Sequence, residues 1–132
     1  MTETKRDPII RTVPHPSDMN GNGDIFGGWV LSQMDVAGGD LAARAAHGRV
    51  ATVAITAMTF IEPIKVGDLV SIYGEVTKIG RTSITIALET VVRRRTENID
   101  RRVTHGTYVF VAIDEHGKPR PIPRPEPETG TA

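Results

Sequence analysis

The chain has 132 residues, with 16 basic side chains, 16 acidic side chains and no cysteine. This length suits one domain with a real core, and the zero net charge argues against a general binder of nucleic acid or of a membrane surface. The lack of cysteine excludes thiol catalysis and disulfides, and no apolar run approaches the roughly 18 residues of a membrane span, so we expect a cytoplasmic protein.

A short strand, a loop and one long helix are predicted in the first 48 residues. Residues 9–13, "IIRTV", predict the strand, and residues 14–24 are dense in turn formers and predict the loop. The helix is predicted from about residue 25 to residue 46, because apolar side chains recur there at three- and four-residue spacings: Val30, Met34, Ala37, Leu41 and Ala45.

Four long strands are predicted in the rest of the domain. Beyond residue 48 the apolar period changes to two, which is the period of a half-buried strand. The strands cover residues 50–61, 68–79, 82–95 and 102–114, and the short turns between them predict antiparallel pairing. We place one domain at residues 1–117. Proline is dense in residues 118–132, so this tail is expected to be extended or disordered.

This order of elements predicts how the layers are arranged. One helix cannot cover both faces of a five-stranded sheet, so we expect a curved antiparallel sheet of about five strands wrapped around one long central helix, which is the α+β hotdog fold. Small residues in the helix, such as Gly38 and Gly39, let the sheet approach it closely. The strand at 50–61 has a free side, and such edges usually pair with another chain, so we expect a dimer with a continuous sheet.

Two stretches resemble the YciA-type acyl-CoA thioesterases, hotdog hydrolases related to brain acyl-CoA hydrolase: "MNGNGDIFGGWVLSQMDVAG" and "AHGRVATVAITAMTFIEPIKVGD". The resemblance continues through "GRTSITI" and "GKPRPIP" and covers almost the whole chain. It implies hydrolysis of the thioester of fatty acyl-CoA by homodimers that assemble further, as trimers of dimers. It also implies that Asp35 does the chemistry, and that Asp24 is the polar residue kept just before the paired glycines.

The spacing of the glycine pair and Asp35 has a chemical interpretation. The first turn of a helix has free N–H groups, and without a Cβ Gly27 and Gly28 let a carbonyl oxygen approach them as an oxyanion hole. Such a donor is worth ~3–4 kcal/mol, against ~1 kcal/mol that a glycine costs a helix. Asp35 lies about 10 Å beyond Gly28 along the axis, whereas a reacting carbonyl must lie within about 3 Å of both groups. We therefore expect a site shared across the dimer, with Asp35 as general base or nucleophile.

Each of these residues also has a structural interpretation. An aspartate before a helix commonly caps it, and for Asp24 capping and lining the site are compatible. By itself Asp35 would be an ordinary exposed helix residue. Its neighbours Met34 and Val36 instead indicate a helix that is buried all round, where a carboxylate needs a partner or a purpose. The glycine pair could serve only close packing.

Three groups of polar residues could hold the phosphates of CoA, because arginine binds phosphate in bidentate fashion. The first group flanks the hairpin "TENID" and comprises Arg93, Arg94, Arg95, Arg101 and Arg102. The second forms the turn "GRTS", with Arg81, Thr82 and Ser83, and the third lies in the tail, with Lys118 and Arg120. The alternative for the hairpin is a solvated surface. Thr59 could hydrogen-bond in the site from the strand expected to pair in the dimer.

No metal ion or cofactor is expected, since the four histidines lack metal-ligand spacing and CoA belongs to the substrate. Two rival functions are weaker. A hotdog enoyl-CoA hydratase pairs its aspartate with a histidine a few residues later, whereas His47 lies twelve residues beyond Asp35. A non-catalytic acyl-CoA-binding hotdog protein of the sensor kind carries a DNA-binding module, for which no residues remain.

Overall fold

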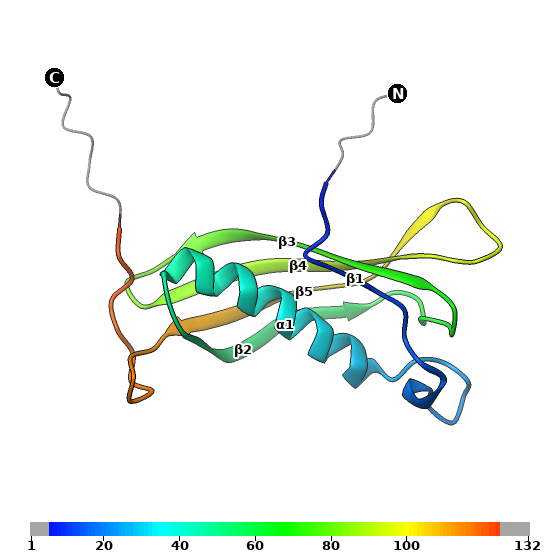
Figure 1. The fold of residues 1–132 in the computed structure, drawn as a ribbon, viewed down its shortest axis with the longest axis horizontal. Coiled ribbons are helices and arrows are strands. Elements are labelled where there is room, and N and C mark those ends of the chain that lie inside the picture. Colours follow the sequence, from blue (N-terminus) through cyan, green and yellow to red (C-terminus); the bar gives the residue numbers. More distant parts are fainter. Residues whose placement is uncertain (1–5, 125–132) are drawn as a thin grey trace, which may run out of the picture.

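One long helix lies across one face of a five-stranded antiparallel sheet in this computed structural model (Figure 1). The structure describes residues 6–124. In chain order the elements are β1 (Ile10–Thr12), a 3-10 turn (Pro16–Asp18), α1 (Gly27–Ala46), β2 (Val50–Phe60), β3 (Leu69–Ile79), β4 (Ser83–Arg93) and β5 (Asp100–Ala112). The strands lie in the order β1-β3-β4-β5-β2, and each neighbouring pair is antiparallel. The predicted hotdog arrangement is confirmed.

The core lies between α1 and the sheet, because the apolar positions of both elements face each other. Its largest fully buried side chains include Met34, Ile72, Ile86, Tyr108 and Phe110. At Gly38 a Cβ atom would come within 2.9 Å of the Leu88 side chain and 3.0 Å of the Phe110 ring. A side chain at this position would push Leu88 and Phe110 aside, so glycine lets the helix lie this close to the sheet, which is the role expected of its small residues.

The side of α1 that faces away from the sheet is open in the single chain. Val36 is 63% exposed, whereas the neighbouring Met34 is fully buried. The expectation of a helix buried all round is wrong for one chain, because one sheet covers only one side of a helix. Within residues 6–124 no helix is long and apolar enough to cross a bilayer.

Among residues 6–124, the strand β2 forms one edge of the sheet and pairs only with β5. It carries large apolar side chains that are about half exposed: Val53 at 56%, Ile55 at 43% and Phe60 at 52%. An unpaired strand edge with exposed apolar side chains is a surface that another chain commonly covers. The single chain therefore leaves open the surface that the sequence predicts for a dimer.

The residues after β5 fold back on the domain. Ile122 is 5% exposed, and its backbone N–H donates to the carbonyl of Arg81 at 2.9 Å. The guanidinium of Arg124 donates to the carbonyls of Ile79 and Gly80 at 3.0 and 2.9 Å. Ile122 lies in a proline-rich stretch but packs against the core, so the domain continues beyond residue 117. Residues 125–132 of the expected tail lie outside the described residues.

Candidate active site

Asp35 lies near the middle of α1, where the first half of β2 passes beside the helix. The hydroxyl of Thr52 donates a hydrogen bond to Oδ1 of Asp35 at 2.6 Å. Hydrogen bonds to an ionised carboxylate are short and strong, so Thr52 fixes the direction in which this carboxylate points. Thr52 is not among the site residues that the sequence predicts. The only feature of the sequence that points to this contact is a hydroxyl-bearing residue in the strand that follows the helix.

Tyr108 lies beneath this pair on the inner face of the sheet. It is fully buried, and its hydroxyl donates to the backbone carbonyl of Leu31 at 2.8 Å. Burial and, to a smaller extent, the negative charge of Asp35 raise the pKa of Tyr108 to about 12. The phenol therefore stays neutral near neutral pH and ties β5 to the helical turn that precedes Asp35.

The first turn of α1 presents free backbone N–H groups beside open space. The helix begins at Gly27 after Phe26, whose carbonyl accepts the N–H of Trp29 at 3.1 Å. The N–H groups of Gly27 and Gly28 come too early to have an acceptor within the helix. A Cβ at Gly27 would stand 3.5 Å from the Phe60 ring, an ordinary contact, and a Cβ at Gly28 would meet nothing within 4 Å. Packing inside the described part of the chain therefore does not require either glycine.

Asp24 lies in the loop before the helix and does not cap it. The cap position is occupied by Phe26 and has no side-chain cap, while the Asp24 carboxylate pairs with the ammonium of Lys65. The capping interpretation of Asp24 is wrong because the helix starts later than that role requires. Asn20, which the sequence analysis did not consider, holds the loop by accepting the N–H groups of Asn22 at 2.8 Å and Asp24 at 3.1 Å.

A hollow of about 270 Å³ opens at this helix start. It lies between the loop and the end of β2, and its lining comprises Asn20, Asp24, Ile25, Gly27, Phe60, Ile61, Glu62 and Pro63. One wall thus consists of polar groups and the glycine turn, and the other is largely apolar. Such a hollow can accept a substrate group next to the free N–H groups.

The glycine turn and Asp35 of one chain are separate along the helix. The strand β2 meets the helix at Gly27 through Phe60 and at Asp35 through Thr52. The seven residues from Gly28 to Asp35 correspond to about 10 Å along a helix axis. No single carbonyl group can contact the oxyanion donors and the carboxylate of the same chain at reacting distance.

Thr59 lies on the other face of the sheet from the Asp35 and glycine turn of its own chain. The register of β2 and β5 pairs Thr59 with His105 and Phe60 with Thr104, and residues directly opposite each other share a face. Thr104 is 1% exposed, and Phe60 lies against Gly27, so these two face the helix. Alternation places Thr59 on the opposite face of the sheet, away from the helix of its own chain, so its role in a site shared across the dimer stays a prediction.

Two of the hairpin arginines, Arg93 and Arg94, have partners within the chain. Nε of Arg93 lies 2.9 Å from the carboxylate of Asp100. Arg94 donates to the carbonyl of Pro63 at 2.7 Å, and its Nε lies 3.5 Å from the carboxylate of Asp68. A CoA phosphate would have to compete with these contacts, so the geometry supports the structural interpretation of the hairpin.

The turn of Arg81, Thr82 and Ser83 lies at the opposite end of β4. The carbonyl of Ser83 accepts the N–H of Gly80 at 2.8 Å, which closes the turn, and the Arg81 side chain is exposed. The 11 residues of β4 span about 35 Å at 3.3 Å per residue. This turn and the hairpin arginines of one chain therefore cannot hold the same phosphate. In the described part of the chain, no group of three or more histidine and acidic side chains could hold a metal ion.

Comparison with known proteins identifies the family of this chain. Residues 22–97 match the model of the Thioesterase superfamily. A Haemophilus influenzae protein, described as an uncharacterized acyl-CoA thioester hydrolase, is 52% identical over 119 residues, which are 88% of this chain and 77% of the relative. Acyl-CoA thioester hydrolase YciA of Salmonella typhimurium is 48% identical over 118 residues, which are 87% and 89% of the two chains.

A solved structure is similar to this chain in both fold and sequence. It is the structure of an aspartate-to-alanine mutant of a hexameric broad specificity acyl-coenzyme A thioesterase. The two sequences are 46% identical, the match covers 94% of this chain and 91% of the other chain, and the TM-score is 0.87. The helix with its five-stranded sheet, the family model and the solved structure define a protein of the hotdog thioesterase class. This chain belongs to the thioesterase superfamily, and its curated relatives include proteins named YciA, which confirms the resemblance.

Proposed function

We propose that this chain hydrolyses acyl-CoA to free acid and CoA at a site assembled from two copies. The proposal rests on two features. The Asp35 carboxylate is oriented by the Thr52 hydroxyl, and the first turn of α1, which the second copy also has, carries free N–H groups. The relatives named acyl-CoA thioester hydrolases support the same substrate class.

The chemistry follows from these groups. As a general base, Asp35 takes a proton from a water molecule, and the hydroxide formed attacks the thioester carbonyl carbon. The first-turn N–H groups stabilise the negative oxygen of the tetrahedral intermediate. The C–S bond then breaks, and the thiolate of CoA takes the proton from Asp35. If Asp35 is instead the nucleophile, its carboxylate attacks the carbonyl carbon, the C–S bond breaks and CoA leaves as the thiolate, which takes a proton from solvent. Water then hydrolyses the mixed anhydride to the free acid and the Asp35 carboxylate, and a rapidly quenched reaction should show an acyl adduct by mass spectrometry.

The dimer that brings the halves together uses the free edge of β2. Pairing two copies of β2 antiparallel about an axis near the middle of the strand places Thr52 near the partner's Phe60. This juxtaposes Asp35 with the glycine turn of the partner and covers the apolar side chains exposed along β2. The relative of known structure is hexameric, and we propose that these dimers assemble further as trimers of dimers.

The experiment is an activity screen with short, medium and long acyl-CoA esters. Asp35→Ala should nearly abolish turnover while the protein still folds and binds CoA. The matched control is Asp40→Ala, which removes an aspartate five residues further along α1 that pairs only with Arg44 on the exposed side. Turnover above about a tenth of the wild-type value in Asp35→Ala would exclude Asp35 as the catalytic group.

The same assay separates the rival functions. Tight binding of acyl-CoA without product would favour a non-catalytic binding protein. Hydration of an enoyl-CoA without release of CoA would favour a hydratase. The cytoplasmic location expected from the sequence remains part of the proposal, and cell fractionation tests it.

A further inference from the structure

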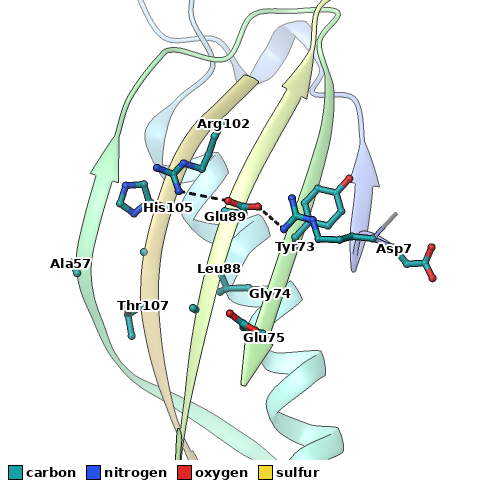
Figure 2. A pocket seen from close by; sticks show the side chains of 13 residues that line it. Asp7, Ala57, Tyr73, Gly74, Glu75, Leu88, Glu89, Arg102, His105 and Thr107 are labelled. Atoms are coloured by element: carbon teal, nitrogen blue, oxygen red, sulfur yellow. Dashed lines mark ion pairs between the residues drawn. The ribbon is translucent and has the colours of Figure 1, made fainter. Parts of the chain in front are cut away.

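The strand β2 contains one extra residue near its middle. Its register with β5 shifts between Thr56 and Thr59, so that two residues of β2, Ala57 and Met58, stand opposite the single Gly106. Ala57 has a φ of 50°, in the left-handed region, and lines a hollow of about 660 Å³ on the face of the sheet away from the helix (Figure 2). Such a β-bulge, which strains an alanine, changes the direction in which the neighbouring side chain points.

The bulge directs Met58 to the face of the sheet that carries the helix. Gly106 alternates there with Thr104 and Tyr108, which are both buried. A Cβ atom at Gly106 would come within 2.6 Å of Cε and 2.8 Å of Sδ of Met58. Met58 packs against the core but is only partly buried. The tip of one flexible side chain therefore fills the space that the glycine leaves.

Met58 lies between the two contacts that β2 makes with the candidate active site. Phe60 lies against the glycine turn, and Thr52 binds Asp35. Met58 is two residues from Phe60, about 7 Å along the strand, and Ile55 follows it on the same face. Phe60 is 52% exposed and Ile55 is 43% exposed. An apolar strip of three side chains thus runs along β2 away from the oxyanion donors.

The two ends of an acyl-CoA molecule differ in what they need from the protein. The phosphates of CoA are charged and stay in water, whereas each methylene group of the acyl chain gains roughly fourfold in binding when it is buried. An acyl chain that extends from the glycine turn along the apolar strip meets Met58: a butyryl group ends before it, and an octanoyl group passes it. Methionine is unbranched and adapts to its neighbours, so its tip can move aside and open the space above Gly106.

We propose that Met58 is the specificity-determining residue for acyl-chain length, because its side chain forms a movable wall of the acyl pocket. The inference rests on the proposed thioesterase function and deepens it by assigning the part of β2 that contacts the acyl chain. The competing route for the chain is the hollow at the helix start, where Ile61 belongs to the apolar wall.

The test compares kcat/KM for octanoyl-CoA with kcat/KM for butyryl-CoA. Met58→Ala should raise the ratio of the two values about fourfold, the gain expected from one further buried methylene group. Gly106→Ala should lower the ratio, because its Cβ would push the tip of Met58 toward the substrate. The double variant Ala57→Gly/Met58→Ala, in which glycine relieves the left-handed strain, serves if the single variant folds poorly.

Leu41→Ala is the matched control. Leu41 covers Gly74 on β3 as Met58 covers Gly106, since a Cβ at Gly74 would lie 3.1 Å from Cδ1 of Leu41. Alanine removes the same number of heavy atoms from leucine as from methionine, so this control should leave the ratio unchanged. An equal rise in Leu41→Ala, or an unchanged ratio in the folded Met58 variants, would overturn the assignment. A rise in Ile61→Ala alone would overturn it as well, in favour of the hollow.

A binding measurement separates this inference from the proposed function. Dissociation constants of the two acyl-CoA esters are measured by calorimetry in Asp35→Ala, with and without Met58→Ala. Selective tightening of octanoyl-CoA by Met58→Ala would support the role of Met58 even if the wild-type protein released no CoA, a result that would refute only the hydrolytic function. Equal effects on both esters would refute the role of Met58 and leave hydrolysis standing.

Discussion

If the site is shared between chains, two inactive variants should restore each other. The first is Asp35→Ala, which removes the carboxylate. The second is Gly28→Pro, which removes one N–H donor at the second residue of α1, within the first turn, where a helix tolerates proline. Each variant alone has the same defect in both sites of its dimer, so each should be nearly inactive.

The expected rescue follows from the geometry. In a mixed dimer one site combines both defects, and the other combines the intact Gly28 of one chain with the intact Asp35 of the other. Random pairing of equal amounts makes about half of the dimers mixed, each with one good site of two. Co-refolding should therefore restore roughly a quarter of wild-type activity, whether or not the dimers assemble further.

The assay is CoA release after co-refolding, compared with the two variants refolded separately. Native mass spectrometry should confirm that mixed dimers form, and thermal unfolding should confirm that Gly28→Pro is folded. If mixed dimers form and activity stays at the level of the separate variants, the donor and the carboxylate belong to one chain. The argument from their separation of about 10 Å along the helix would then be wrong.

Three further variants test individual contacts. Thr52→Val should lower kcat about tenfold or more with little change in KM, since a hydrogen bond to a charged group is worth ~1.5–3 kcal/mol. The control Thr52→Ser keeps the hydroxyl and should retain most activity. Equal kcat in the two variants would show that Thr52 does not orient Asp35. Tyr108 has its pKa raised to about 12, so the unfolded phenol ionises first as the pH rises above 10. Wild-type stability should then fall by about 1 kcal/mol by pH 11 in urea unfolding, whereas Tyr108→Phe should lack this loss. Asp24→Ala should lower the free energy of unfolding by less than about 1 kcal/mol, because it breaks only a partly exposed ion pair with Lys65. It should also reduce turnover less than Asp35→Ala does. A loss of unfolding free energy above about 2 kcal/mol would show that Asp24 has a structural role that this ion pair does not explain.

The sequence by itself determined the elements and their layers. Apolar spacing of three and four residues defines α1, and the change to a period of two defines the strands, because each periodicity places one set of side chains on one face. The distance between Gly28 and Asp35 also follows from the sequence alone, since the rise of a helix is constant. These properties depend on neighbours along the chain, and for that reason they can be derived without a fold.

Only the tertiary structure decided which side chains meet. Thr52 contacts Asp35 across 17 positions of sequence, and the register between β2 and β5 turns Thr59 to the outer face. The start of the helix after Phe26 leaves Asp24 to pair with Lys65, 41 positions away. Such contacts are set by how strands align and where a helix begins in three dimensions. Local periodicity carries no information about either, because a shift of one residue preserves the pattern of an element and changes every partner.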